Sequence, residues 1–523
     1  MADPKPAPEY SSVAELLETY RRRDSGKVAL VDVDANRRMT FGELAAAVEG
    51  IAVQLAGMGM GKGSRVVLLA DTGIEKVVAW LAIWRIGAVV CPLDLSLMRT
   101  AAATILQTIG PDLVVADPRQ ADFAHAVGTI RLADWDARTD VAWPTAVPRG
   151  GELVVDTRYI QGAADMPPSP VVNDVACLSC TSGTAGLPKI VVYDHQAYWE
   201  NGLDSIDLLA LTEHDRTLEY RSLGWYSAQI LSLMPFLQTG LTLHLARRFS
   251  AHQLLDWIEA NRITVCAGVP TVIRILLSQP ASDAARRCVS LRAVTSSSAP
   301  LSPAHEIRFE QVYGVRVLNL YGSSETGWIT GNREAAHKVG TVGRAVNRVQ
   351  LGIVSDSDQQ CPPGVPGQMM VRADKLALGY LQKDKLLDPI RGKPFNLRDT
   401  AVIDAQGYVQ ILGRSDDLIS RGGAKISPME IEEVLLTHPD VLEAGVIGVP
   451  DPIYGQQPAC FVVARPGRDI EARELLAHCA ALLPREKVPI RAILIAELPR
   501  NERGKVLRSR LAEFYRYLNP NAA

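Results

Sequence analysis

The stretch TSGTAGLPK spans residues 181–189 and directly follows the apolar run VACLSC. Its glycines let the chain turn tightly and bring backbone N–H groups close to a ligand, as anion-binding loops do. The hydroxyl groups of Thr181, Ser182 and Thr184 can rotate toward an oxygen atom, and Lys189 adds a point charge. We therefore interpret this stretch as a loop that binds an anion, most simply a phosphate.

The spacing of this loop differs from that of ordinary P-loop kinases and GTPases. Their pattern is G-x-x-x-x-G-K-[ST], whereas here two residues separate Gly183 from Gly186 and Pro188 precedes the lysine. A short loop of glycine, serine and threonine is also common as a plain surface turn. The rest of the chain must therefore decide between these two interpretations.

Length and composition indicate an ordinary globular protein. The chain has 523 residues, 47% of them hydrophobic and 22% charged, and a formal net charge of −3. This length requires more than one domain, and this charge gives no reason to expect nucleic acid or an anionic membrane as partner. The apolar segment 77–93 is interrupted by Arg85 and Gly87, so we expect a buried helix followed by a strand and no membrane insertion.

The eight cysteines favour a reduced, cytoplasmic protein. Only Cys177 and Cys180 are close in sequence, and no second pair accompanies them as a structural zinc site would require. Many of the others lie in apolar runs, where cysteine acts as a small buried hydrophobe. The first ten residues lack the apolar core of a signal peptide. A cytoplasmic location is the expectation that follows.

Most of the chain alternates helical patterns with short apolar strands. Thr40 and Glu43 form a capping box ahead of a helix. The expected strands read as the apolar runs RVVLLA, AVVCPL, DLVVAD, LTLHLA, ITVCAGVP, LRAVTSSSAP and VRVLNLYG. Such strands between helices predict an α/β fold whose sheets are covered on both faces. Near residue 350 glycine and proline become denser, the strands read as short and antiparallel, and we place a domain boundary at 413–417.

Four more stretches combine small residues with a few functional groups. YGSSETG follows an apolar strand, at the end where α/β sheets bind ligands; Tyr321 offers a flat face for a base, and Glu325 suits Mg²⁺. Asp399 in FNLRDTAVID can accept two hydrogen bonds from a ribose diol. Arg414 in GRSDD suits a phosphate or ribose, and Lys505 follows a glycine in NERGKVLR. Each stretch alone is also typical of a turn or linker.

The order of these stretches closely resembles the acyl-adenylate-forming (ANL) superfamily, which includes acyl-CoA synthetases, firefly luciferase and the adenylation domains of peptide synthetases. The resemblance covers the chain from the capping-box helix to Lys505. It implies a large N-terminal domain at 1–412, with layered α/β sheets and a small β-barrel-like part, a hinge at 413–417 and a small mobile α+β lid domain at 418–523. The implied function is that of an AMP-forming carboxylate–CoA ligase, with ATP, Mg²⁺ and coenzyme A acting on a small carboxylic acid.

The resemblance also implies roles for residues at matching positions. The catalytic set would be Lys505, Glu325, Thr181 and Lys189, with Glu325 holding the metal. ATP and AMP would be bound by Thr181, Ser182, Gly183, Thr184, Gly186, Lys189, Ser298, Ala299, Pro300, Tyr321, Gly322, Ser323, Ser324, Asp399, Ile411, Arg414 and Lys505. The acyl pocket would be lined by Trp225, Tyr226, Gln229, Gly268, Ser297, Gly322, Gly327 and Trp328. Asp416 would be the hinge, and CoA would pass Arg421, Gly422, Gly423 and Ala424.

Several positions depart from the family pattern. Ile190 and Arg398 replace glycines that relatives usually carry, and Trp225 stands where many relatives have a histidine that borders the acyl pocket. Gly322 stands where acetate-specific relatives have a tryptophan, so we expect a pocket deeper than acetate requires. The acid stays open among short branched, hydroxylated, aromatic and alicyclic acids.

Two other functions stay open at this point. A stand-alone adenylating enzyme would load its acyl group on a carrier-protein thiol, but long basic insertions or a fused carrier domain would favour it and we see neither. A nucleotide-binding regulator without catalysis is the second alternative, which the presence of Glu325, Asp399 and Lys505 disfavours. The oligomeric state also stays open, with a homodimer as one option.

Overall fold

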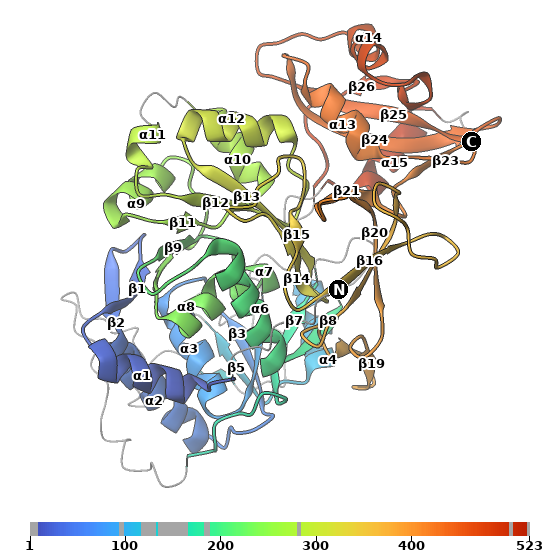
Figure 1. Ribbon diagram of the computed structural model, residues 1–523. Helices are drawn as coiled ribbons and strands as arrows, with labels where there is room; N and C mark the ends of the chain where they lie inside the picture. Colours follow the sequence, from blue (N-terminus) through green and yellow to red (C-terminus); the bar gives the residue numbers. More distant parts are fainter. Residues whose placement is uncertain are drawn as a thin grey trace.

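The protein is described by a computed structural model that covers residues 9–93, 99–116, 132–133, 166–181, 189–279, 284–500 and 506–519. Figure 1 shows a large body that holds the two main sheets and a small body formed by the C-terminal part of the chain. Within the covered residues, none of the helices combines the length and the apolar character that crossing a membrane needs.

One main sheet has eight strands. In spatial order they are β19 (Leu387–Pro389), β18 (Gly379–Leu381), β8 (Ile190–Asp194), β7 (Val175–Cys180), β4 (Val89–Pro92), β3 (Arg65–Leu69), β5 (Leu113–Ala116) and β6 (Leu132–Ala133). The pairs from β7 to β6 are parallel, whereas β8 joins β7 and β18 in antiparallel register. The segment predicted as helix and strand, 77–93, forms the buried helix α3 (Ile74–Arg85) and then β4.

The second main sheet has nine strands. In spatial order they are β15 (Arg344–Ala345), β14 (Gly327–Gly331), β13 (Arg316–Ser323), β12 (Ala293–Ser296), β11 (Val265–Cys266), β9 (Arg216–Glu219), β10 (Thr242–Leu245), β1 (Val28–Asp32) and β2 (Arg37–Thr40). The central pairs are parallel, and the edges at β14 and β2 are antiparallel. Because β12 and β13 are parallel, their carboxyl ends open on the same edge, where the Ser298 and Tyr321 stretches follow.

Helices cover both faces of these sheets, as the sequence predicts. In the large body they are α1 (Val13–Asp24), α2 (Phe41–Gly57), α3, α4 (Arg99–Ile109), α6 (His195–Leu209), α7 (Tyr226–Ala228), a π-helical segment (Gln229–Leu233), α8 (Met234–Thr239), α9 (Leu254–Asn261), α10 (Pro270–Leu277), α11 (Ala284–Arg287) and α12 (Pro303–Tyr313). The predicted capping box starts α2: Thr40 Oγ1 accepts from Glu43 N at 3.3 Å and Glu43 Oε2 accepts from Thr40 N at 2.7 Å. The largest core joins residues of α2, α3 and α6 to strands of both sheets.

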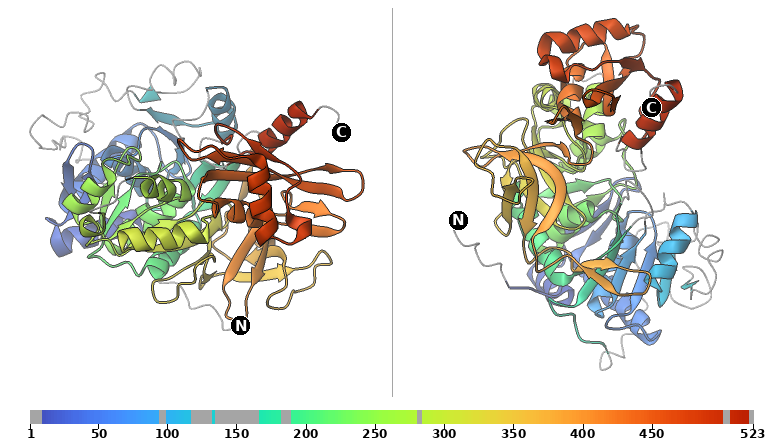
Figure 2. Two further views of the ribbon diagram at one scale, coloured as in Figure 1. Left: turned by 90° about the horizontal axis from the view of Figure 1, so that it is seen from above. Right: turned by 90° about the vertical axis from the view of Figure 1, so that its right-hand side faces the viewer.

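The rest of the chain forms two smaller sheets. An antiparallel sheet of β16 (Gln350–Val354), β17 (Gly367–Arg372), β20 (Phe395–Ile403) and β21 (Val409–Arg414) stands where the small barrel-like part is predicted. The C-terminal sheet contains β23 (Ala424–Ile426), β22 (Ile419–Arg421), β25 (Gly455–Ala464), β24 (Val441–Asp451) and β26 (Ala492–Leu494), with helices α13 (Pro428–Leu436), α14 (Ala472–Leu482) and α15 (Arg508–Leu518). This sheet and its helices enclose cores of their own. Figure 2 shows the C-terminal body at one end of the large one.

A buried ion pair connects helix α6 to the segment between β17 and β18. The ammonium group of Lys375 is fully buried; it donates to the carboxylate of Asp204, to the carbonyl oxygen of Trp328, and to Asn201 Oδ1 at 3.0 Å. Arg348 Nη1 contacts the other oxygen of Asp204 at 3.0 Å. Burial lowers the pKa of Lys375, and the charge of Asp204 opposes that shift. All three donor positions of the Lys375 ammonium therefore have an acceptor, and a buried charge paired in this way is costly to uncover.

We predict that Lys375→Met unfolds at lower denaturant concentration than the wild type. The change leaves the Asp204 carboxylate buried with half of its counter-charge, which typically costs about 3–5 kcal/mol of unfolding free energy. Lys338→Met is the matched control, because Lys338 pairs with Asp404 on the surface and exposed pairs contribute little. Equal stability of the two variants in urea titrations would contradict the prediction.

Candidate active site

The ends of the predicted phosphate loop are held together by the hairpin of β7 and β8. Thr181 N donates to the carbonyl oxygen of Lys189 at 2.9 Å, and Lys189 N donates to Thr181 Oγ1 at 3.2 Å. Both residues therefore lie at the base of the loop that connects the two strands. The loop between them carries the predicted ligands Ser182, Gly183, Thr184 and Gly186, which lie outside the described residues.

A phenol links the loop lysine to the predicted metal ligand. The ammonium group of Lys189 lies 4.4 Å from the centre of the Tyr380 ring, a cation–π contact. The hydroxyl of Tyr380 donates to Glu325 Oε1 at 2.8 Å. Burial, and next the charge of Glu325, raises the pKa of Tyr380, so this hydroxyl stays protonated and available as a donor to Glu325. Sequence reasoning missed Tyr380, because LALGYLQ carries no motif.

The predicted adenine and ribose ligands also meet through a phenol. Tyr321 OH donates to Asp399 Oδ2 at 2.5 Å, and Arg414 Nε lies 3.7 Å from Asp399 Oδ1. The antiparallel register of β20 and β21 places Asp399 directly opposite Arg414. Burial, and next the charge of Asp399, raises the pKa of Tyr321. Arg398 adopts φ = 58°, the left-handed conformation that a glycine would take at little cost.

The backbone turn beside Tyr321 leaves polar groups available for a ligand. Ser298 has φ = 71° in the turn that continues to Ala299 and Pro300 after β12. The hydroxyl oxygens of Ser296 and Ser297 are buried and have no hydrogen-bond partner within the described residues. Buried hydroxyls normally find a partner, so this turn retains capacity for a polar ligand.

The predicted metal ligand, Glu325, lies in the tight turn that joins β13 to β14. Ser323 Oγ accepts from Glu325 N at 3.2 Å, and the carbonyl oxygen of Ser324 accepts from Tyr193 OH at 2.6 Å. One carboxylate oxygen of Glu325 therefore meets Tyr380, while the backbone of the turn is fixed from two sides. A single carboxylate that completes its shell with phosphate oxygens and waters is what Mg²⁺ accepts, so the residues present fit this ion.

The glycines of the predicted acyl pocket have packing reasons. A Cβ atom on Gly322 would lie 2.0 Å from the Gly327 carbonyl oxygen, and one on Gly268 would lie 2.1 Å from the Thr295 carbonyl oxygen. The close pairing of β13 with β14 therefore requires glycine at position 322. The expectation of a pocket deeper than acetate requires stays a prediction.

The aromatic members of the predicted pocket surround helix α6. Tyr226 stacks on Tyr193 with 4.1 Å between ring centres, and Trp328 Nε1 donates to Ser205 Oγ at 2.8 Å. Trp225 is half-buried and immediately precedes α7. Gln229 is fully buried, accepting from Tyr198 OH at 2.6 Å and donating to the Leu223 carbonyl oxygen at 2.8 Å. Its amide is thus already engaged within the core.

Ile190, one of the departures from the family pattern, has a structural explanation. It is the first residue of β8, it is buried, and it pairs with Cys180 on one side and Leu381 on the other. A β-branched side chain suits this central strand position, and it lies beside the loop without removing any of the loop's ligands.

The predicted hinge lies between the two bodies, and the predicted CoA residues belong to the C-terminal sheet. Asp416 belongs to the turn that connects β21 to β22. The Arg421–Ala424 hairpin is mostly exposed; Gly422 (φ = 56°) and Gly423 (φ = 88°) form its tip. Gly422 N donates to the Tyr454 carbonyl oxygen at 2.8 Å. Among the described residues, this hairpin forms no hydrogen bond or ion pair with Tyr321 or Asp399, so the predicted CoA residues are separate from the predicted adenylate residues in this arrangement.

The predicted catalytic lysine, Lys505, lies outside the described residues, but the chain just before it is placed. Arg500 Nη2 donates to Glu443 Oε1 at 2.8 Å. Burial, and next the charge of Arg500, lowers the pKa of Arg274 in α10. The segment that leads to Lys505 therefore runs beside the large body.

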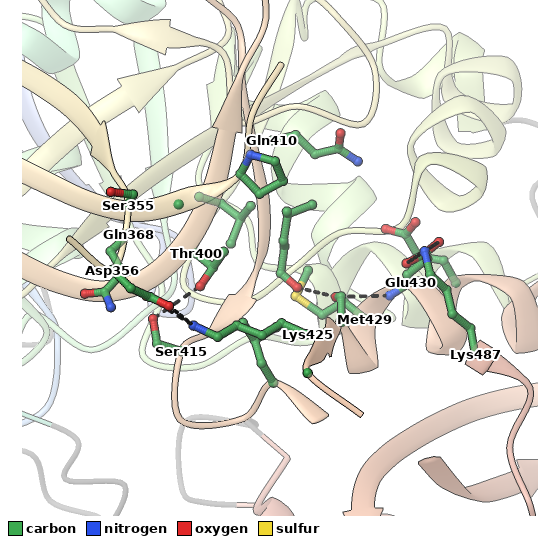
Figure 3. A pocket seen from close by; sticks show the side chains of 18 residues that line it. Ser355, Asp356, Gln368, Thr400, Gln410, Ser415, Lys425, Met429, Glu430 and Lys487 are labelled. Carbon is green, nitrogen blue, oxygen red and sulfur yellow. Dashed lines mark hydrogen bonds and ion pairs between the residues drawn. The ribbon is translucent and has the colours of Figure 1, made fainter. Parts of the chain in front are cut away.

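A cleft of 720 Å³ separates the antiparallel sheet from the C-terminal body (Figure 3). One wall carries Asp356 and Ile411, and the other carries Lys425 and Glu433. Lys425 Nζ crosses the cleft to Asp356 Oδ2 at 2.8 Å. Burial, and next the charges of Glu430 and Glu432, raises the pKa of Glu433 from 4.5 to about 7.

We predict that Glu433→Gln stabilises the protein above pH 7 but not below pH 4.5. The raised pKa means that the folded state holds a proton that the unfolded state releases, so the wild type loses stability as pH rises from 4.5 through 7. Glutamine removes this loss, worth about 1–2 kcal/mol after allowing for solvent in the cleft. Thermal unfolding at both ends of this range checks the sign; a gain of equal size at both would contradict it.

Known proteins resemble the chain along nearly all of its length. The AMP-binding enzyme family matches residues 17–381, and the AMP-binding enzyme C-terminal domain matches residues 430–505. The chain is 30% identical to sulfoacetate–CoA ligase of Cupriavidus necator, over 96% of this chain and 97% of that protein. It is also 30% identical to indoleacetate–CoA ligase of Aromatoleum aromaticum, over 94% and 96% of the two chains.

Solved structures agree with this assignment. ATP-bound MatB from Rhodopseudomonas palustris matches with a TM-score of 0.83 at 27% identity, over 97% of this chain and 99% of that one. The apo crystal structure of MatB matches with a TM-score of 0.75. With the family match spanning both bodies and the site residues of the large one brought together, the chain belongs to the AMP-binding enzymes of the acyl-adenylate-forming superfamily.

Proposed function

We propose that this protein is an AMP-forming acid–thiol ligase that activates an organic acid with ATP and transfers the acyl group to coenzyme A. The observation that carries the proposal is the pair of side-chain clusters that join residues of the two main sheets and the antiparallel sheet. These clusters are Lys189–Tyr380–Glu325 and Tyr321–Asp399–Arg414. One cluster suits phosphates and the other suits a nucleoside. The names of the relatives, all CoA ligases in the comparisons above, support the same activity.

In the first half-reaction a carboxylate oxygen of the acid attacks the α-phosphorus of ATP, which forms acyl-AMP and releases pyrophosphate. Tyr321 and Asp399 would hold the adenosine, while Lys189 and the loop hydroxyls would bind the outer phosphates. Mg²⁺, held by Glu325, would offset phosphate charge when bound. Lys505 would offset the charge that develops between acid and phosphate.

In the second half-reaction the thiol of coenzyme A attacks the acyl carbon and AMP leaves. For this step the lid domain would turn about Asp416, withdraw Lys505 and present the Arg421–Ala424 hairpin to the site. Two observations support such a rotation: the C-terminal body has its own cores, and the hairpin faces solvent in the present arrangement. The TM-score is higher with ATP-bound MatB (0.83) than with apo MatB (0.75), which supports an arrangement close to the ATP-bound one.

The acid belongs to the class of small carboxylic acids, and its identity is decided by experiment. Pyrophosphate release would be measured with a panel of aliphatic, hydroxylated, dianionic and aromatic acids, followed by thioester detection with coenzyme A. Release without thioester would favour the carrier-loading alternative, and no release with any acid would favour the inactive regulator.

All eight cysteines are free thiols, which supports a cytoplasmic location.

The half-reactions should respond differently to two substitutions. Lys505→Ala should slow acyl-AMP formation by about 10²–10³-fold, the loss seen when one preorganised donor is removed, and should spare thioester formation from supplied acyl-AMP. Asp416→Pro fixes φ at the hinge and should slow the CoA step more than adenylation. Within the described residues the backbone N–H of Asp416 donates no backbone hydrogen bond in this arrangement, so proline removes none here. Equal slowing of both steps by Lys505→Ala would exclude the rotation.

A further inference from the structure

Asn201 occupies an unusual place in the large body. Its side chain is fully buried in the middle of α6, and both ends of its amide reach other elements. Oδ1 accepts from Trp328 N and from Lys375 Nζ, each at 3.0 Å. Nδ2 lies 2.8 Å from the Ala197 carbonyl oxygen, 3.3 Å from Tyr226 OH and 3.3 Å from the Lys375 carbonyl oxygen. One amide therefore joins α6, α7, β14 and the Lys375 segment.

Packing makes this junction rigid. A Cβ atom on Gly327 would lie 1.9 Å from Asn201 Oδ1, and Gly327 has φ = 65°. The start of β14 thus lies directly against the amide with no room for a side chain. Lys375 is held in turn by Asp204. Movement of Asn201 would therefore displace the start of β14 and the ring of Tyr226 together.

Tyr226 connects Asn201 to the turn that contains Glu325. Its ring stacks on Tyr193, and Tyr193 OH donates to the carbonyl oxygen of Ser324, the residue before Glu325. The contacts run from Asn201 through two aromatic rings to the turn that presents the metal ligand. The phenol of Tyr226 and the backbone of β14 are also two of the walls proposed for the acyl pocket.

We propose that Asn201 is a positioning residue that sets the width of the acyl pocket by holding Tyr226 and the start of β14 at a fixed separation. This inference rests on the proposed function, because it concerns the acid that is activated. Asn201 does not touch the adenine or ribose ligands. It therefore acts directly on the walls of the acyl pocket and only through two aromatic rings on the turn that carries Glu325, so the choice of acid should change more than the binding of ATP.

The test uses the full-length protein and three substitutions. Asn201→Leu keeps a similar shape and removes all polar contacts, whereas Asn201→Asp keeps an acceptor for Trp328 N and Lys375. Tyr226→Phe removes only the hydroxyl that meets Asn201. Asn332→Leu is the control: Asn332 is equally buried in the same body, but its amide bonds Thr341 and Lys338.

Pyrophosphate release is measured with propionate and with benzoate, and the ratio of the two kcat/KM values is compared among variants. Loss of the contacts of Asn201 should change this ratio about threefold to tenfold in Asn201→Leu, because the hydrogen bonds that hold Tyr226 and the start of β14 at a fixed separation are removed. Tyr226→Phe should change it in the same direction by a smaller factor. Asn201→Asp should restore the ratio toward the wild type, and the KM for ATP should stay within about twofold in all of them. Asn332→Leu should lower the thermal midpoint without moving the ratio.

A folded Asn201→Leu protein with the wild-type ratio would overturn the inference. If Asn201→Leu does not fold, Tyr226→Phe decides in its place: an unchanged ratio there overturns the inference, and a changed ratio supports it. An equal change of ratio in Asn332→Leu would also overturn it, because any buried asparagine would then have the same effect. A wild-type protein that activates none of the panel acids is a different outcome, which refutes the proposed function itself.

Discussion

The buried ammonium of Lys375 is the interaction on which the arrangement of the large body depends. A charge placed in a low-dielectric interior must be paired and fully hydrogen-bonded. Lys375 meets this condition only where Asp204, Asn201 and the Trp328 carbonyl oxygen converge. These partners come from a helix and from a strand of the second main sheet, so the network fixes the two sheets and the helix between them in one geometry.

Tyrosine hydroxyls carry that geometry to the active site. Tyr193, Tyr321 and Tyr380 each donate to a carbonyl or carboxylate oxygen that belongs to a different element. Burial raises the pKa of both Tyr321 and Tyr380, so both act as donors throughout the neutral range. A neutral hydroxyl can hold the carboxylate of Asp399 or Glu325 in place without cancelling its negative charge. That carboxylate can still bind a ribose hydroxyl or a metal ion.

The C-terminal body is connected more loosely. It buries its own hydrophobic residues, and across the cleft it meets the large body through polar groups such as Lys425 and Asp356. An exposed ion pair contributes little stability, and Ser427 Oγ adds one bond to the Leu412 carbonyl oxygen. Contacts of this kind permit rearrangement at modest cost, whereas the buried network of the large body does not.

The sequence by itself determined the layered α/β class, the helix and strand at 77–93, the capping box of α2 and the order of motifs that identifies the family. Local periodicity and contiguous motifs encode all of these. The sequence did not reveal the roles of Tyr380, Tyr193, Asn201 and Lys375. Each has no motif of its own and contacts a partner at least 55 residues away. Gly322 also has a packing reason that the sequence does not reveal, because a Cβ atom there would lie 2.0 Å from the Gly327 carbonyl oxygen. Only the tertiary structure decides which side chains meet, because packing of distant segments sets their distances and local propensity does not.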